Sequence, residues 1–326
     1  MKAKKHIILF LFLCLSLAGL FLADLCLGST IFSLREQGEL YRHILINIRL
    51  PKALTAILAG SALSVSGILM QTLFRNPLAG PYILGVSSGA SLGVAFVVMC
   101  TSIFGMVRAG AGTIAVAAII GSTLVLLLVM SVAGKVKSNV SLLIVGMMIG
   151  AVAGALVNIM QNIANPDALK LFIVWTLGSL SSVGWNELAT MAVVLLVGAV
   201  LVVLLLKPLN GMLLGENYAR ALGVNIRNTR TLIVLATSLL AGGVTAWCGP
   251  IAFIGVAVPH LARGIMHSSN HLLTVPACAL LGANILLFCD CLVSLAAYSL
   301  ALSLPISTLS SLIAAPVIIY VILKQR

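Results

Sequence analysis

Long apolar runs recur along the whole chain, with short polar connections between them. Most of the runs hold enough residues to cross the hydrocarbon layer of a bilayer, which takes about 20 residues of α-helix. A proline, a basic residue or a Gly/Asn cluster bounds most of them, as is typical of helix ends. The ten predicted spans are residues 7–27, 51–74, 82–104, 109–133, 141–163, 188–206, 230–248, 252–266, 272–293 and 304–323.

The composition indicates that lipid surrounds these helices. Hydrophobic residues make up 61% of the 326 positions and charged residues only 8%, whereas a soluble domain carries about 25% charged residues. So few charged side chains cannot coat a globule that faces water. We therefore expect an all-α fold, a polytopic membrane bundle of about ten transmembrane helices that forms one domain over residues 1–326.

The first run follows Lys2, Lys4 and Lys5, and this order resembles a signal peptide. The run extends from Ile7 to Gly28, however, which is longer than the usual signal core of about 7–15 residues, and it lacks a clean small-residue cleavage site. We therefore predict that it is the first membrane helix.

The basic residues predict how the helices are oriented. With the N-terminus in the cytoplasm, 13 of the 19 Lys and Arg residues lie on the inner side, as the positive-inside rule favours. The prediction is therefore N-in and C-in, and the net charge of +12 reflects topology rather than a nucleic-acid partner. The connection at 29–52 is an exception, because its four basic residues fall on the outer side and indicate a docking surface.

A short motif occurs twice in the chain. Leu58-Ala59-Gly60 is followed by Gly67, and Leu240-Ala241-Gly242 is followed by Gly249, so both stretches read LAG-x6-G. The two copies fall in predicted spans that point in opposite directions across the membrane. Inverted repeats of this kind are common in transporters, and we predict one here.

The residue types that catalysis needs are scarce. The chain has seven Asp and Glu residues, no Cys/His group at metal-ligand spacing and no GxxxxGK[ST] motif, which is the sequence that cradles nucleotide phosphates. We therefore predict no catalytic residue, no metal site and no cofactor in this chain, so that the protein is not an enzyme. The seven cysteines are expected to pack as small apolar side chains.

Asp290 is the clear acidic residue within a predicted span. Ionisable groups inside spans are typical of ion-coupled carriers, so a self-sufficient ion-coupled secondary transporter or channel remains the alternative function. The simpler interpretation is that Asp290 pairs with a hydroxyl or amide group on a neighbouring helix. His267 and His271 are expected in a solvated loop.

The inner connection at 207–230 reads KPLNGMLLGENYARALGVNIRNTR. We predict a short helix over 216–222, and Gly223 then ends it as a C-terminal glycine does. Apolar residues available for packing are Leu213, Leu214, Ala221 and Leu222. Such a helix can rest on lipid headgroups or insert into a cleft on a soluble partner, and we favour the partner.

Several stretches together resemble the FecCD-type permeases of binding-protein-dependent ABC importers. The resemblance runs from about residue 7 to the C-terminus. The stretches that carry it are Ile48-Arg-Leu-Pro-Lys52, Arg75-Asn-Pro-Leu-Ala79, Pro81-Tyr-Ile-Leu-Gly-Val-Ser-Ser-Gly89, Gly215-Glu-Asn-Tyr-Ala-Arg-Ala-Leu-Gly223, Phe253-Ile-Gly-Val-Ala-Val-Pro-His-Leu-Ala-Arg263, Leu304-Pro-Ile-Ser307 and Ala315-Pro316.

The resemblance implies a permease subunit in the bacterial plasma membrane. It pairs with a second copy or a paralogue, two cytoplasmic ATPase subunits bind ATP and Mg below it, and an extracytoplasmic binding protein delivers the substrate from above. The family imports iron–siderophore complexes, haem and cobalamin. Iron–siderophore or haem is the first expectation and cobalamin the second.

The resemblance also implies roles for particular residues. The segment that couples to the ATPase would contain Gly215, Glu216, Ala219, Arg220, Leu222 and Gly223. Arg49 and Lys52 would pair with carboxylates on the binding protein, where complementary charge speeds docking. Asn139 and Val140, within the stretch 137–141, would help to close the cytoplasmic gate.

This chain departs from the family pattern at several positions of the outer face. Gly80 stands where many members have an acid, and Ser294 stands where a basic residue is frequent. Ser303 replaces an acid before Leu-Pro, and Ser307 replaces a glycine after it. These departures concern contacts with the binding protein rather than transport.

Overall fold

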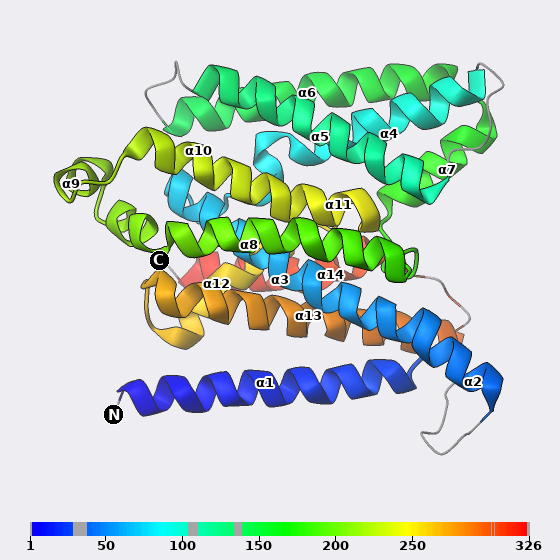
Figure 1. Ribbon diagram of the computed structural model, residues 1–326, viewed down its shortest axis with the longest axis horizontal. Coiled ribbons are helices and arrows are strands. Elements are labelled where there is room, and N and C mark those ends of the chain that lie inside the picture. Colours follow the sequence, from blue (N-terminus) through cyan, green and yellow to red (C-terminus); the bar gives the residue numbers. More distant parts are fainter. Residues whose placement is uncertain are drawn as a thin grey trace.

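The computed structural model describes residues 2–28, 38–103, 110–133, 139–300, 302 and 304–324, and these ranges contain helices and no strand (Figure 1). The elements in chain order are α1 (Lys2–Cys26), α2 (Glu39–Ile44), the π-helix η1 (Leu45–Arg49), α3 (Leu50–Phe74), the 3₁₀-helix η2 (Pro81–Leu84), α4 (Val86–Ile103), α5 (Ala111–Ala133), α6 (Asn139–Ile163), α7 (Pro166–Thr176), α8 (Trp185–Leu213), α9 (Glu216–Ala221), α10 (Ile226–Thr237), the π-helix η3 (Ser238–Gly242), α11 (Gly243–Cys248), α12 (Ile254–Met266), α13 (His271–Leu300) and α14 (Ile306–Lys324).

Seven helical segments of the described chain are long and apolar enough to cross a membrane, and three shorter apolar helices accompany them. Each of the ten predicted spans coincides with one of these segments or helices. A polytopic membrane bundle is therefore confirmed, whereas ten crossings remain a prediction. The helix α7 was not among the predicted elements, and it follows α6 after a short break at Asn165.

The second predicted span begins earlier than its sequence indicates. Pro51 has no backbone N–H, so the pattern favoured a helix that starts there. The structure instead has one continuous helix from Glu39 to Phe74. The π-helical turn η1 ends at Arg49, two residues before Pro51, and such a turn accommodates a break in the regular hydrogen-bond ladder.

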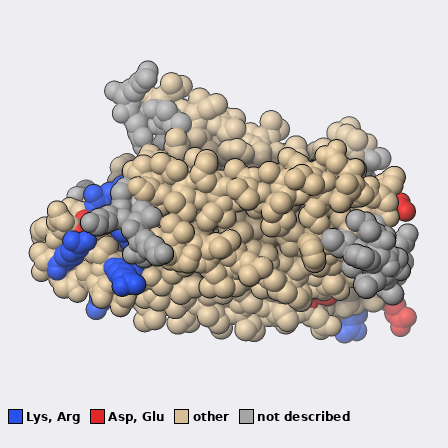
Figure 2. Space-filling model, turned by 90° about the horizontal axis from the view of Figure 1, so that it is seen from above, with Lys and Arg blue, Asp and Glu red and all other residues tan. Residues whose placement is uncertain are grey.

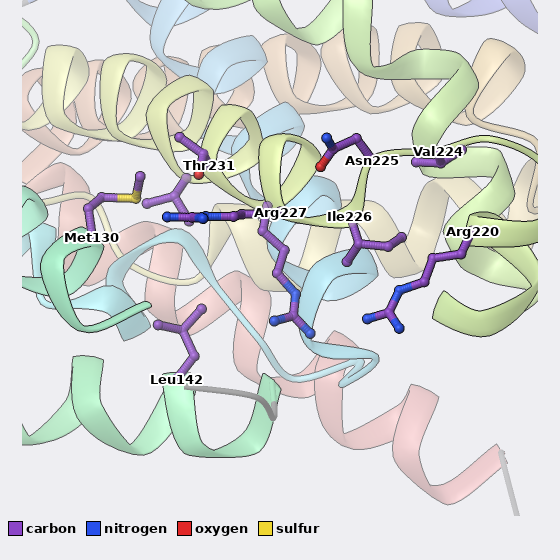
Figure 3. Close-up of a pocket in the computed structure, with 10 residues that line it drawn as sticks. Met130, Leu142, Arg220, Val224, Asn225, Ile226, Arg227 and Thr231 are labelled. Carbon is purple, nitrogen blue, oxygen red and sulfur yellow. The ribbon is translucent and has the colours of Figure 1, made fainter. Parts of the chain in front are cut away.

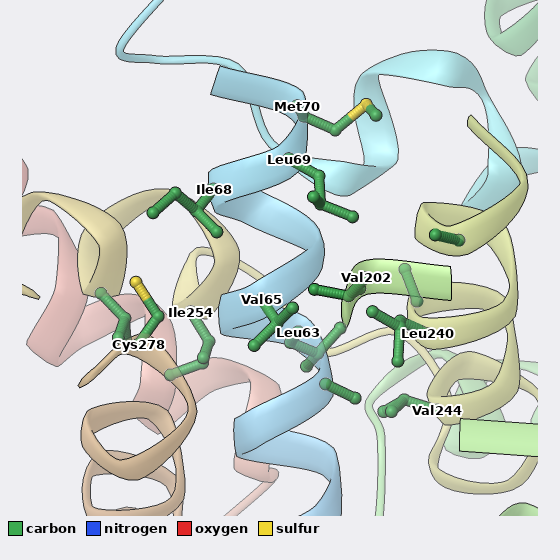
Figure 4. Close-up of a cluster of buried hydrophobic side chains, with 14 of the residues drawn as sticks. Leu63, Val65, Ile68, Leu69, Met70, Val202, Leu240, Val244, Ile254 and Cys278 are labelled. Carbon is green, nitrogen blue, oxygen red and sulfur yellow. The ribbon is translucent and has the colours of Figure 1, made fainter. Parts of the chain in front are cut away.

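The bundle is built around α3, which has most of its side chains buried. Figure 4 shows side chains of α3 such as Leu63 and Leu69 among partners from several helices, including Val202 of α8, Ile254 of α12 and Cys278 of α13. In lipid, close packing rather than the hydrophobic effect holds helices together. A central helix that packs on several sides therefore organises the whole bundle.

Two glycines of α3 allow the closest helix contacts. A Cβ atom at Gly60 would collide with the backbone of Gly282 on α13, and one at Gly67 would collide with the backbone of Gly255 on α12. Small residues at such crossings let helix backbones touch. Gly249, which corresponds to Gly67 in the LAG-x6-G motif, instead ends α11 with φ 71°, and the inverted repeat remains a prediction.

The two ends of the bundle carry different elements. The N-terminus, the C-terminal helix end and α9 lie at one end, whereas α2 and α7 lie at the other (Figure 1). We call these the α9 end and the α2 end. The face seen in Figure 2 is mostly uncharged between the ends, and basic side chains gather at the α9 end. This distribution is that of a bundle whose middle faces lipid.

Candidate functional site

Glycines with positive φ separate the short helix α9 from the helices on either side of it in the chain. Gly215 precedes it with φ 119° and Gly223 follows it with φ 82°. A side chain at either position would be strained, since L-residues rarely adopt positive φ. The predicted short helix at 216–222 is thus confirmed, with Leu222 as its C-cap residue.

Two contacts fix α9 to the bundle. Ala219 is buried and lies against Gly211 of α8. Glu216 forms an ion pair with Arg230 of α10, with 2.7 Å between Oε1 and Nη2. Arg75, at the end of α3, donates from Nη2 to the carbonyl oxygen of Met212 at 3.2 Å, in the last turn of α8. A force applied to α9 therefore reaches α8 and α10 directly, and α3 through α8.

The outward side of α9 and of its approach is apolar. The exposed fractions are 67% for Leu214, 52% for Tyr218 and 60% for Leu222. Leu213 is also exposed. Large apolar side chains that cluster at an exposed tip are typical of a surface that binds another protein. The geometry of α9 therefore suits insertion into a partner.

The predicted docking residue Lys52 lies at the other end of the bundle and is engaged within the chain. Its Nζ is 2.9 Å from Oδ2 of Asp290 and donates to Oγ of Ser294 at 2.8 Å. The Asp290 side chain is 3% exposed. Asp290 thus pairs with a cation from α3, and the prediction that it pairs with a hydroxyl or amide group is wrong.

This ion pair explains one departure from the family pattern. Ser294 accepts a hydrogen bond from Lys52, and a basic residue at this position would place a second positive charge beside the lysine. The departure at Gly80 has a steric explanation, because a Cβ atom there would lie 2.8 Å from Cγ2 of Val256. Ser303 lies outside the described residues.

Arg49 is also engaged within the chain. It is buried and its Nη1 donates to the carbonyl oxygen of Leu25 at 2.8 Å. Nearby, Sγ of Cys291 lies 3.7 Å from Oδ1 of the buried Asp24. The two predicted docking residues therefore help to join α1, α3 and α13, and their contact with a binding protein remains a prediction.

The predicted gate residues lie at the start of α6, at the same end as α9 (Figure 1). Val140 is 65% exposed. The side chain of Asn139 and residues 137–138 lie outside the part of the chain that is described. The structure thus brings the coupling and gate residues to one end and the docking residues to the other.

His271 is buried, and the prediction that it lies in a solvated loop is wrong. Its Nδ1 lies 2.9 Å from Oδ1 of Asn210, and its Nε2 lies 2.9 Å from Oγ1 of Thr72. His271 therefore connects α3, α8 and α13. Its sequence neighbours Ser268 and Asn270 are polar, and nothing in that pattern indicated a buried contact. His267 is exposed, as predicted.

A cleft of about 600 Å³ opens beside α9 (Figure 3). Its walls are the start of α10 with the end of α9 on one side, and α5 with α6 on the other. Three arginines line it, namely Arg220, Arg227 and Arg230. The sequence indicated Arg227 and Arg230 only as topology signals and Arg220 as part of the coupling segment, and it did not indicate a cleft because α5 and α6 are distant in the chain. Within the described ranges, no group of three His, Cys, Asp or Glu side chains is arranged to hold a metal ion.

Comparisons with known proteins identify relatives over almost the whole chain. The model of the FecCD transport family matches residues 8–324. The hemin transport system permease protein HmuU of Yersinia pestis is 37% identical over 286 residues, which cover 87% of this chain and 84% of that protein. The vitamin B12 import system permease protein BtuC of Shigella boydii is 34% identical over 320 residues, which cover 96% and 95%. A metal-chelate type ABC transporter solved in an inward-facing conformation has a TM-score of 0.86 and 29% identity, and the match covers 97% of this chain and 99% of that one.

Proposed function

The chain belongs to the FecCD transport family and is a permease subunit of an ABC importer, and we propose that its cargo is a metal chelate. Iron–siderophore complexes or haem are the first candidates and cobalamin the second. The support comes from relatives named for hemin and for vitamin B12 and from a structural neighbour of the metal-chelate type.

ATP hydrolysis by a separate pair of ATPase subunits on the cytoplasmic side drives this permease. The single observation that carries this assignment is α9, a short helix fixed to α8 and α10 with Leu214, Tyr218 and Leu222 exposed on its outward side. When ATP closes the ATPase pair, α9 moves with it and shifts the helices to which it is fixed. ATP and Mg belong to the partner, and this chain holds no cofactor.

If α9 contacts the ATPase on the cytoplasmic side, the orientation of the rest of the assembly follows. Both chain ends and α9 face the cytoplasm, ten helices cross the bacterial plasma membrane, and the two halves of the chain form an inverted repeat. The permease pairs with a second copy or a paralogue, so that the pathway runs between the two subunits. Asn139 and Val140, at the α9 end, contribute to the cytoplasmic gate.

A binding protein docks at the α2 end. Arg49 and Lys52 supply positive charge to this face, although both also bond within the chain. Acidic groups of the binding protein would share these cations with their internal partners. The docking contact is therefore weaker than one made by free side chains, and the departure at Ser294 lies on the same face. Gly80 was expected on this face but lies beside Val256, near Gln71 in the α9 half of α3.

An ion-coupled carrier or channel has less support. Such a protein needs an ionisable group that is free to bind its ion. Asp290 was the candidate, and its carboxylate is in an ion pair with Lys52. The cation of Lys52 neutralises Asp290 and so removes the charge that an incoming cation would bind.

The test is a double substitution on α9, Glu216→Ala with Leu222→Ala, in the permease assembled with its ATPase. We expect uptake and binding-protein-stimulated ATP hydrolysis to fall together while the bundle stays folded. Lys170→Ala, on the exposed surface of α7 at the other end, is the matched control and should leave both unchanged. Normal stimulation and uptake in the α9 variant would refute the coupling role.

A further inference from the structure

The arginine cleft beside α9 carries more positive charge than the chain neutralises. Arg230 is paired with Glu216. Arg220 and Arg227 are exposed and have no hydrogen-bond or ion-pair partner among the residues that the structure describes. Figure 3 shows both guanidinium groups extending into the space between α10 and α6. Two unneutralised guanidinium groups that face one cleft favour an anionic ligand.

Several other cations of the helices are paired within the chain. Lys52 pairs with Asp290, Arg49 and Arg75 donate to carbonyl oxygens, and Arg263 donates to Oε1 of Gln71 at 2.7 Å. The cleft therefore differs from the rest of the described bundle, where buried cations are used to join helices. Its charge is available to something outside the chain.

Apolar side chains share the cleft with the arginines. Met130 of α5 and Val224, just before α10, line it and are partly exposed. Leu142 of α6 and Val234 of α10 also line it but are almost fully buried. The cleft thus combines positive charge with a partly exposed apolar wall.

We propose that this cleft binds an anionic phospholipid, with the headgroup phosphate on Arg220 and Arg227 and an acyl chain against Met130 and Val224. Guanidinium groups match phosphate oxygens in a bidentate geometry. The cleft also lies where α5 ends and α6 and α10 begin, and basic pockets between helices on the cytoplasmic side are typical sites for such lipids.

An acidic segment of a soluble partner is the competing occupant, and the apolar wall of the cleft argues against it. A carboxylate side chain reaches the arginines but leaves the partly exposed side chains of Met130 and Val224 uncovered. A phospholipid satisfies both parts. The bound lipid would contact Arg220 of the coupling segment and the first turn of α6, and so would tie these two parts of the α9 end together.

The experiment measures lipid retention by the full-length permease, purified in detergent and exchanged into nanodiscs that contain phosphatidylglycerol or phosphatidylcholine. Native mass spectrometry counts the lipids that stay bound. We expect wild type to retain phosphatidylglycerol over phosphatidylcholine. Arg227→Gln should weaken that retention about tenfold, which corresponds to about 1.4 kcal/mol, because a charged donor to the phosphate is lost, and Arg227→Lys should weaken it less.

Lys207→Gln is the matched control, because Lys207 is an exposed cation at the same end but does not line the cleft. It should leave phosphatidylglycerol retention unchanged. An equal loss in Lys207→Gln would mean diffuse charge attraction and would overturn the site. If inorganic phosphate alone, or the headgroup glycerophosphoglycerol without acyl chains, bound the cleft as well as phosphatidylglycerol does, the lipid assignment would be overturned.

A separate measurement tests whether the cleft instead binds a soluble protein partner. If Arg227→Gln weakened association with the ATPase but left phosphatidylglycerol retention at the wild-type level, the cleft would belong to the protein interface and the proposal would fail. Thermal unfolding of each variant without added lipid should match wild type, because Arg227 has no partner within the described part of the chain whose loss would destabilise the fold.

Discussion

The α9 end and the α2 end both carry basic residues, but they use the charge differently. At the α2 end, Lys52 and Arg49 are bonded to Asp290 and to the carbonyl oxygen of Leu25. At the α9 end, Arg220 and Arg227 face an open cleft, and Leu222 of the same segment is exposed. One end is closed by its own contacts, and the other presents charge and apolar surface outward.

This difference follows from the cost of charge in lipid. A cation inside the bundle must be paired, because an isolated charge in a low-dielectric medium is expensive. A cation at the end of a span reaches water or headgroups and needs no internal partner. The same residue type therefore joins helices at one end and is available for binding at the other.

The largest expected effect is at the closed end. Replacing Lys52 with Met leaves the buried carboxylate of Asp290 without its cation, which costs about 3–5 kcal/mol of folding free energy. We expect a marked fall in the unfolding midpoint of the purified protein. The double variant Lys52→Met/Asp290→Leu removes both charges and should recover most of the loss. No recovery in the double variant would show that the ion pair is not the source of the effect.

A smaller loss is expected from Arg49→Gln. The substitution removes a charged donor from the carbonyl oxygen of Leu25, and hydrogen bonds to charged groups contribute about 1.5–3 kcal/mol. The same variant tests docking. If Arg49 also attracts the binding protein, association should slow at low salt and approach wild type at high salt, since salt screens exposed charge. A salt-independent change would leave Arg49 with its structural role alone.

At the open end we expect loss of coupling without loss of stability. The pair Tyr218→Ala and Leu222→Ala removes exposed side chains, and such changes usually alter unfolding free energy by less than about 0.5 kcal/mol. Anchor residues of interfaces contribute more than about 1 kcal/mol to binding, so affinity for the ATPase should fall about tenfold. Unfolding and co-purification assays measure the two effects separately. Equal affinity in both proteins would contradict the partner-binding role of α9.

The smallest effect is expected at the ion pair between Glu216 and Arg230. Both side chains are about one-fifth exposed, and pairs of this kind contribute about 0.2–1 kcal/mol. Glu216→Gln should therefore shift the unfolding midpoint only slightly. A shift as large as that of Lys52→Met would remove the distinction between the two ends.

The sequence predicted the helices well because their signal is local. A run of apolar residues indicates a span whatever its neighbours are, and positive φ at Gly215 and Gly223 suits the glycines that bound α9. Pro51 misled the prediction because a π-helical turn before it allows the helix to continue from Glu39. A local pattern does not report such a turn.

Contacts between distant segments were the part that the sequence did not reveal. Lys52 and Asp290 are 238 positions apart, and nothing near either residue indicates the other. His271 was expected in solvent because its neighbours are polar, yet Thr72 and Asn210 from two other helices surround it. The arginine cleft likewise forms only when α10 meets α5 and α6.

Uptake by proteoliposomes tests the central claim most directly. The permease is reconstituted with its ATPase and binding protein, and radiolabelled haem or an iron–siderophore complex is offered on the side of the binding protein. We predict accumulation only when ATP is present on the α9 side, with none under a proton or sodium gradient when the ATPase is omitted. Accumulation by the permease alone under an ion gradient would contradict the account.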